Sequence, residues 1–119
     1  MNAPIIIPGV WTIKALSVRG RRFAMEYVDS LQLQEQEKIL SLLLRTSQNG
    51  PPKNREKFRK VGAKIFEFKS YQDRILCFFR PNNVIVLTHG FRKKRDRTDR
   101  AEIVRATDLR CLYLEREGD

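Results

Sequence analysis

The spacing of apolar and polar positions divides the chain into seven predicted elements. Apolar residues recur three and four positions apart over residues 21–31, 34–47 and 99–115, which is the spacing of one buried helix face. Short runs rich in aromatic and β-branched residues predict strands over residues 11–18, 64–69, 74–80 and 83–91. The predicted order is therefore β-α-α-β-β-β-α.

The connections between these elements indicate how they pack. The last three predicted strands are joined by residues 70–73 and 81–83, and connections this short favour antiparallel pairing. Residues 53–60 are basic and lack a period, so we expect a loop there. Asp99 and Glu102 match a capping box at the start of the last helix. We expect an α+β fold in which the two consecutive helices cover one face of the sheet.

The length and the apolar content indicate one small domain. The chain has 119 residues, of which 41% are hydrophobic, enough for one core but too few for two domains of typical size. We therefore expect a single domain over residues 1–119. No apolar run approaches the roughly 20 residues of a membrane helix. The N-terminal apolar residues follow no basic segment and have a proline on each side, so we expect no signal peptide and a cytoplasmic protein.

The two cysteines do not suggest a disulfide framework or a metal site. Cys77 lies in a predicted strand and Cys111 in the last predicted helix, and we expect both to be buried, reduced thiols. No group of residues has the spacing of metal ligands, so we expect neither a metal nor another cofactor.

The net charge points to a polyanionic partner. The chain carries 24 Lys and Arg against 14 Asp and Glu, for a formal net charge of +10 and a pI of about 10.1. Nucleic acid, an anionic membrane or an acidic protein would satisfy this charge. Residues 51–119 hold 18 of the basic and 10 of the acidic side chains, so most of the excess lies there.

One stretch of the sequence matches a known pattern over three consecutive elements. Phe66-Glu67-Phe68 and residues 73–79 precede an apolar strand that ends in His-Gly-Phe-x-Lys-Lys over residues 84–94, and Thr98, Glu102-Ile103 and Ala106 follow. This pattern resembles the RelE/HigB superfamily of bacterial and phage toxins, in particular its phage-derived branch. Asp99 stands where family members commonly have proline. Because Asp also caps helices, the change affects helix stability more than function.

The resemblance implies a fold, an activity and partners. It implies helices packed on a small, twisted, mostly antiparallel sheet whose other face is a basic concavity. Members of this superfamily are toxins of type II toxin-antitoxin systems, metal-independent endoribonucleases that cut mRNA in the A site of the ribosome and inhibit translation. It further implies a cognate antitoxin, in this branch often a helix-turn-helix protein, and contact with operator DNA only through the antitoxin complex.

The implied reaction is attack of a ribose 2′-hydroxyl on the adjacent phosphate, and it assigns roles to three basic residues. Such an attack needs a proton acceptor, a stabiliser of the phosphorane charge and a proton donor to the leaving 5′-oxygen. Arg74 lies where the family has an arginine at the scissile phosphate, although it could instead pair with Asp73 or Glu67. Lys93 and Lys94 either transfer protons, with a pKa lowered by neighbouring cations, or only hold the RNA backbone.

Further residues are candidates for binding the substrate. Lys57, Arg59 and Lys60 lie in the predicted basic loop, where family members have basic residues that attract phosphates, and Arg92 and Arg95 extend the same charge.

Two aromatic side chains near these lysines have an open role. Phe91 either stacks on a base or belongs to the core. His89 is the single histidine of the chain, which excludes a mechanism that uses two histidines. At the end of an apolar strand it is more typical of a structural residue than of a catalyst, but it stays a possible site residue.

Two other functions fit the same sequence. One is a non-catalytic, basic module that binds nucleic acid, and the other is a small phage protein that binds an acidic partner. The enzyme requires Arg74 and one of Lys93 and Lys94 to converge on one phosphate-sized site, which neither alternative needs.

Overall fold

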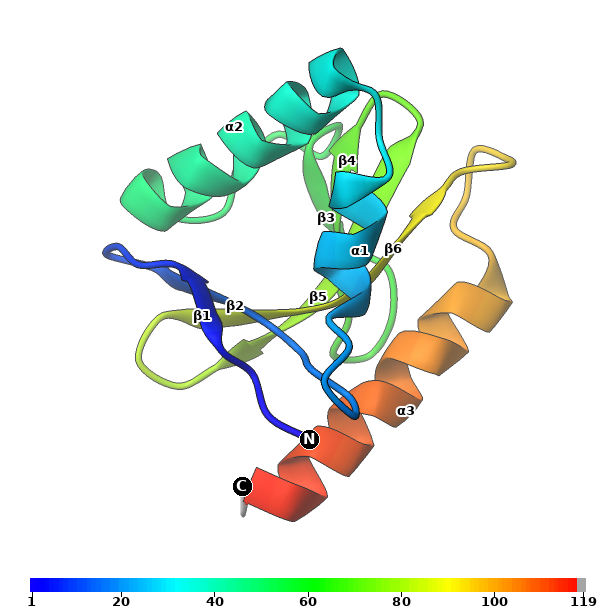
Figure 1. The fold of residues 1–119 in the computed structure, drawn as a ribbon. Coiled ribbons are helices and arrows are strands. Elements are labelled where there is room, and N and C mark those ends of the chain that lie inside the picture. Colours follow the sequence, from blue (N-terminus) through cyan, green and yellow to red (C-terminus); the bar gives the residue numbers. More distant parts are fainter. Residues whose placement is uncertain (118–119) are drawn as a thin grey trace.

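Six strands form one open sheet in the computed structural model, which describes residues 1–117 (Figure 1). Three helices pack against this sheet, so the predicted α+β class is confirmed. The elements in chain order are β1 (Ile5–Ile7), β2 (Thr12–Ala15), α1 (Phe23–Asp29), α2 (Leu33–Asn49), β3 (Phe58–Lys60), β4 (Phe66–Ser70), β5 (Asp73–Arg80), β6 (Val84–Arg92) and α3 (Arg100–Glu117).

The sheet is antiparallel except at one junction. Its strand order is β1-β2-β6-β5-β4-β3. β4 to β6 form the predicted antiparallel meander, and β3 adds a further antiparallel strand beside β4. β2 and β6 are parallel, with Thr12 opposite Val84 and Ala15 opposite Leu87. Parallel neighbours need a long crossover. Here the crossover includes α1, α2 and the three strands that lie between β2 and β6 in sequence.

Each face of the sheet has its own hydrophobic core. Successive residues of β5 alternate between the two cores, because side chains of a strand point to opposite faces. Ile75 and Cys77 pack with residues of α1 and α2, whereas Leu76 and Phe78 pack with residues of α3. This burial on both faces explains why the middle of β5 is continuously apolar.

The face that α3 covers changes from apolar to polar along the sheet. Leu76 and Phe78 lie under α3, but the next residue of β5 on that face is Arg74. On β4, the same face carries the buried Glu67, which pairs with Leu76 in the strand register. The basic concavity implied by the resemblance can therefore occupy only the part of this face that α3 leaves uncovered.

A β-bulge sets which face the last residues of β6 occupy. Cys77 pairs with Leu87 and Leu76 pairs with His89, so Thr88 is an extra residue in β6. Because of the bulge, the side chains of His89 and Phe91 lie on the face that α3 covers, and Phe91 is opposite Arg74. Gly90 consequently points to the face that α1 covers.

The two short strands at the edges of the sheet were not predicted from the sequence. Residues 58–60 were expected in a loop but form β3, because Phe58 pairs with Phe68 across to β4 and stacks on the ring of Phe66. β1 was not predicted, and it forms by pairing with β2. Both strands depend on tertiary pairing rather than on a local pattern.

The two cysteines differ in burial. Cys77 is fully buried in the core, as expected, and burial raises the pKa of its thiol. The expectation for Cys111 was wrong, because it lies on the exposed side of α3.

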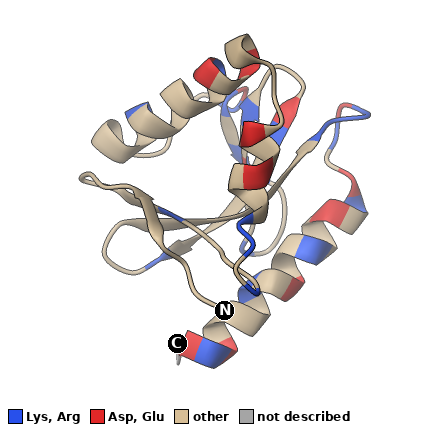
Figure 2. Ribbon diagram, viewed as in Figure 1, with Lys and Arg blue, Asp and Glu red and all other residues tan. Residues whose placement is uncertain are grey.

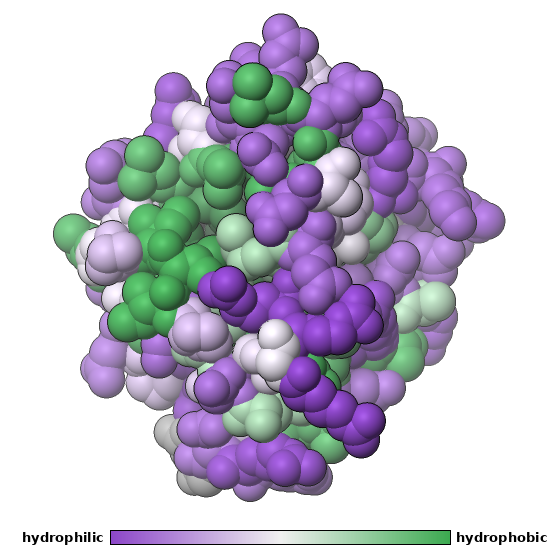
Figure 3. Space-filling model, viewed as in Figure 1, coloured by the Kyte–Doolittle hydropathy of each residue, from purple (hydrophilic) through white to green (hydrophobic). Residues whose placement is uncertain are grey.

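The surface combines charged regions with one apolar region. Figure 3 shows hydrophobic side chains gathered over β1 and the second half of α2, and Ile5, Val10, Leu40 and Leu44 are exposed there. None of the helices within residues 1–117 is both long enough and apolar enough to cross a membrane.

Candidate functional site

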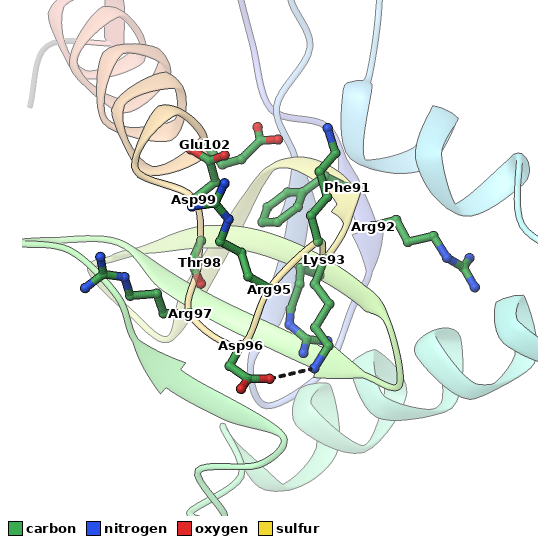
Figure 4. Close-up of a pocket in the computed structure, with 11 residues that line it drawn as sticks. Phe91, Arg92, Lys93, Arg95, Asp96, Arg97, Thr98, Asp99 and Glu102 are labelled. Atoms are coloured by element: carbon green, nitrogen blue, oxygen red, sulfur yellow. Dashed lines mark ion pairs between the residues drawn. The ribbon is translucent and has the colours of Figure 1, made fainter.

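A small cavity lies where the ends of β5 and β6 meet the segment that leads into α3 (Figure 4). Its volume is about 40 Å³, and its walls are Arg74, Glu102 and residues 91–99. The three predicted catalytic residues, Arg74, Lys93 and Lys94, all contribute to these walls. Cationic side chains outnumber the acidic ones in the walls, so the cavity favours an anion.

Arg74 is buried and its orientation is fixed by three contacts. Its Nε lies 2.8 Å from Oε1 of Glu67, and its Nη1 donates hydrogen bonds to the carbonyl oxygens of Tyr71 and Asp73. Only 4% of the residue is exposed. Burial lowers the pKa of Arg74 and the charge of Glu67 opposes this, but arginine starts so high that it keeps its charge. The alternative pairing with Glu67 therefore exists, while Arg74 still lines the cavity.

Glu67 joins the sheet to the segment before α3. Its carboxylate is fully buried and accepts a hydrogen bond from the hydroxyl of Thr98, and Nε of Arg59 lies 3.7 Å from its Oε2. The sequence indicated Glu67 as a possible partner of Arg74, but not its contacts with Thr98 and Arg59. Side chains alternate along a strand, so Glu67 lies on the same face as Lys69, which is opposite Arg74. This alternation could have indicated that Glu67 faces the site.

Lys93 is held at the start of the segment that closes the cavity. Its backbone N–H donates to the carbonyl oxygen of Gln72, and its Nζ lies 3.8 Å from Oδ1 of Asp96 (dashed in Figure 4). The carbonyl oxygen of Asp96 in turn accepts a long hydrogen bond from Arg59. Lys94 is exposed and follows directly.

A lysine with a lowered pKa occurs at a position that sequence reasoning did not select. Lys69 lies opposite Arg74 in the β4–β5 register. The main cause is burial, which lowers the pKa of Lys69, and the positive charges of Arg59, Arg74 and Lys93 lower this pKa further. The position of Lys69 on the strand next to Arg74 could have indicated from sequence that this lysine belongs to the site.

His89 is buried beside the cavity and contacts one of its walls. It is 1% exposed, its Nε2 lies 3.0 Å from Oε1 of Glu102, and its Nδ1 lies 3.2 Å from the hydroxyl of Thr88. Burial lowers the pKa of His89, and the hydrogen bond to Glu102 opposes that shift.

The predicted capping box of α3 is only half formed. Oδ1 of Asp99 accepts a hydrogen bond from the backbone N–H of Ala101, as a capping residue does. The side chain of Glu102 does not return to Asp99 but reaches His89 instead. The prediction was right for Asp99 and wrong for Glu102, because a buried imidazole offers the carboxylate another donor.

Phe91 and Arg92 are adjacent in β6 but point to different sides. Phe91 lines the cavity, with its ring centroid 5.8 Å from that of His89. Arg92 also borders the cavity, but its guanidinium extends away from the other side chains (Figure 4). Its Nη1 lies 3.2 Å from Glu35 of α2 and 3.9 Å from Asp73. Arg92 thus contributes less charge to the cavity than the sequence suggested.

The predicted group of Lys57, Arg59 and Lys60 is not gathered in one place. Arg59 reaches Glu67 and the carbonyl oxygen of Asp96, and it lines a shallow depression beside β3. The exposed Arg95 borders both this depression and the cavity. Lys60 lines that depression, whereas Lys57 lines a separate groove beside α2. Figure 2 shows the wider pattern, with basic residues on β3, β4 and the segment after β6.

No metal site was found in the described part of the chain. Within residues 1–117 no three His, Cys, Asp or Glu side chains are grouped so that they could hold a metal ion. The chemistry that the cavity offers comes from guanidinium, ammonium and carboxylate groups.

Comparison with known proteins assigns the chain to a family. No curated protein matches the chain. The model of the family described as phage derived protein Gp49-like (DUF891) matches residues 26–110, which extend from α1 into α3 and include every residue of the cavity. This match covers well over half of the sequence. The chain therefore belongs to the Gp49-like family of phage-derived proteins, which is a RelE/HigB-like toxin family.

Proposed function

We propose that the protein is the toxin of a type II toxin-antitoxin system and that it inhibits translation by cutting mRNA on the ribosome. The observation that carries the proposal is the cavity in which Arg74, with its guanidinium fixed, lies with Lys93 and Lys94. Family membership supports the toxin, and the cavity supports phosphate chemistry.

Arg74 has the donors that a phosphate requires. A guanidinium has five N–H donors, of which Nε faces Glu67 and Nη1 serves two backbone carbonyl groups. Within residues 1–117 no hydrogen bond or ion pair engages Nη2, so its two N–H groups are available to the oxygens of a scissile phosphate. Because the guanidinium is held by the protein, it needs little reorganisation when charge develops on the phosphorane.

The other cavity residues fit the remaining needs of the reaction. The ammonium group of Lys93 or Lys94 protonates the leaving 5′-oxygen, and the ring of Phe91 offers a surface on which a base stacks. Arg95 adds phosphate attraction at the rim, and Arg59 does so at the adjoining β3 edge. The chemistry requires no metal, and the products are a 2′,3′-cyclic phosphate and a 5′-hydroxyl.

A toxin of this kind requires a neutralising partner. We infer a cognate antitoxin, of the helix-turn-helix type, whose acidic residues fit the +10 charge of the chain and whose apolar residues cover the exposed region over β1 and α2. Operator DNA is then contacted only through the complex. The site of action is the cytoplasm, where translated mRNA is found.

The experiment that tests the function compares induced expression of the wild type with Arg74→Ala and with the double variant Lys93→Ala/Lys94→Ala, while mRNA 5′ ends are mapped in the same cells. Arg116→Ala, an exposed change at the far end of α3, is the matched control. We expect the wild type and the control to arrest growth and to leave new cuts inside translated frames, and the site variants to do neither. Normal growth and intact mRNA despite soluble wild-type protein would rule out the enzyme.

Two observations favour a second function, a non-catalytic module that binds nucleic acid. Glu67 compensates the charge of Arg74, and the cavity of about 40 Å³ is small for a nucleotide. In that case purified protein would bind RNA in a salt-dependent manner and leave ribosome-bound mRNA uncut.

A further inference from the structure

The cavity contains an acid-base pair that no sequence motif for the activity had assigned. We propose that Glu102 accepts the proton of the attacking ribose 2′-hydroxyl and that His89 is the positioning residue that orients the Glu102 carboxylate. This inference rests on the proposed ribonuclease function and supplies the proton acceptor that the cationic residues of the site lack.

Glu102 reaches the cavity from the first turn of α3. Its side chain is 30% exposed and lines the cavity together with Arg74. Figure 4 shows Glu102 and Asp99 at the end of the cavity formed by α3. His89 engages Oε1 of Glu102, and within residues 1–117 no hydrogen bond or ion pair occupies Oε2. One carboxylate oxygen is therefore held by the protein and the other is available to a substrate.

The remaining groups of the cavity are unsuited to accept a proton. Arginine and lysine side chains are ordinarily protonated at neutral pH, so they donate. Two other carboxylates line the cavity besides Glu102. Asp96 is fully exposed and pairs with Lys93, and Asp99 is engaged in capping α3. Glu102 is the carboxylate whose environment is both partly buried and fixed by a buried donor.

His89 donates to Glu102 in either of its charge states. The hydroxyl of Thr88 lies 3.1 Å from the carbonyl oxygen of Leu76 and 3.2 Å from Nδ1 of His89. If the hydroxyl donates to Leu76, its oxygen accepts from Nδ1–H and His89 is a cation that donates from both nitrogens. If it donates to Nδ1, His89 is neutral and still carries its proton on Nε2. The carboxylate of Glu102 accepts a hydrogen bond in both arrangements.

The charged groups around His89 are few. Burial lowers its pKa, Glu102 raises it, and Arg105 on α3 lowers it. Thr88 of β6 and Leu76 of β5 pack against it without charge. The orientation of the pair is thus set by the sheet and by α3 together.

The proposed step is balanced. The 2′-hydroxyl proton passes to Oε2 of Glu102 as the 2′-oxygen bonds to phosphorus, and the bond from phosphorus to the 5′-oxygen breaks. The leaving 5′-oxygen takes a proton from the ammonium group of Lys93 or Lys94. Exchange of protons with water then returns the carboxylate and the lysine to their starting forms.

The test measures single-turnover cleavage of mRNA on purified ribosomes by the full-length protein between pH 5 and pH 9. We expect Glu102→Gln to lower the cleavage rate about 10²- to 10⁴-fold, as loss of a general base does. Glu115→Gln, which makes the same change at an exposed carboxylate near the other end of α3, is the matched control and should stay within a few-fold of the wild type.

His89 is tested by two variants of similar size. His89→Gln keeps a donor toward Glu102 and should retain most of the cleavage rate, whereas His89→Met removes the donor and should lower the rate. Co-sedimentation with ribosomes and thermal denaturation accompany each variant. A merely structural role would lower the cleavage rates of the two variants alike, in step with their thermal stability.

Each outcome separates this inference from the proposed function. If the wild type cuts mRNA and Glu102→Gln cuts it equally well, the role of Glu102 is wrong while the ribonuclease stands. If Glu102→Gln no longer binds ribosomes, or no longer folds, the carboxylate has a binding or structural role and the inference is overturned. If the wild type itself does not cut, the proposed function fails first.

Discussion

Arg74 and Glu67 form an ion pair that is almost completely withdrawn from solvent, with 5% and 0% of the two side chains exposed. The pair lies beside a cavity whose walls are mostly cationic, so the carboxylate that offsets the charge of Arg74 also fixes the guanidinium in place. Desolvation makes such a pair costly to form, and removal of one partner leaves a buried, uncompensated charge.

Glu67→Ala should therefore destabilise the protein by about 3–5 kcal/mol. The expected loss is large because Arg74, Arg59 and Thr98 all contact this carboxylate. Urea denaturation followed by circular dichroism measures it. Glu115→Ala, at an exposed position of α3, is the control and should change the free energy of unfolding by less than about 0.5 kcal/mol. Equal stability of the two variants would contradict the role given to the buried pair.

Gly90→Ala should also destabilise the fold, by about 1–3 kcal/mol, because β6 approaches α1 too closely for a side chain. A Cβ at Gly90 would lie 2.5 Å from Cδ2 of Tyr27. The ring has little freedom to move, since the hydroxyl of Tyr27 donates to the buried carboxylate of Asp73.

A double-mutant cycle with Tyr27→Ala isolates the contribution of the ring to this contact, because Cβ of residue 27 stays 2.9 Å from the added Cβ. In the Tyr27→Ala background, Gly90→Ala should cost clearly less than it does in the wild type. Additive losses of stability would show that the strain arises elsewhere.

The free energy of unfolding should decrease as the pH is lowered, over a pH range that the pKa of His89 determines. Burial lowers the pKa of His89 in the folded state below its ordinary value of 6.5. The unfolded chain therefore binds a proton more readily, and the free energy of unfolding decreases as pH falls below about 6.5 towards the folded-state pKa. Above about pH 6.5 this contribution is constant. Thermal denaturation from pH 8 to pH 5 should show a steeper decrease for the wild type than for His89→Gln, and parallel curves would refute the prediction.

The apolar region over β1 and α2 should bind the antitoxin. Leu44→Glu places a charge among exposed apolar side chains, so it should weaken the complex at least tenfold without affecting cleavage of ribosome-bound mRNA. Co-expression with the antitoxin gene and titration calorimetry of the pair measure the effect. Val104→Glu, an exposed apolar position on α3, is the control. If both variants are neutralised as well as the wild type, the antitoxin binds another surface.

The elements that could be predicted from sequence are those with a strong local period. The helices and the strands of the meander appeared with errors of a few residues, because their apolar positions repeat within each segment. β1 and β3 could not be found in this way, since three residues carry no period and the strands form only against their neighbours.

The site shows the same division. Arg74, Lys93 and Lys94 were candidates because the resemblance assigns roles to them, but that they line one cavity could not be read from the sequence, since the pairing of β5 with β6 brings them together from separate segments. The contact between His89 and Glu102 depends on the bulge at Thr88, which turns His89 towards α3. A strand read as strictly alternating would place His89 on the opposite face, so sequence reasoning assigned Glu102 to the helix cap and left His89 without a partner.

The parallel pairing of β2 with β6 also governs when the fold is completed during synthesis of the chain. β2 emerges from the ribosome early, but its neighbour in the sheet is complete only when Arg92 has been made. Pairings between such distant segments form slowly, because a long stretch of chain must be closed first. The walls of the cavity and α3 come later still. A nascent chain therefore has no assembled cavity while most of its own message is being translated.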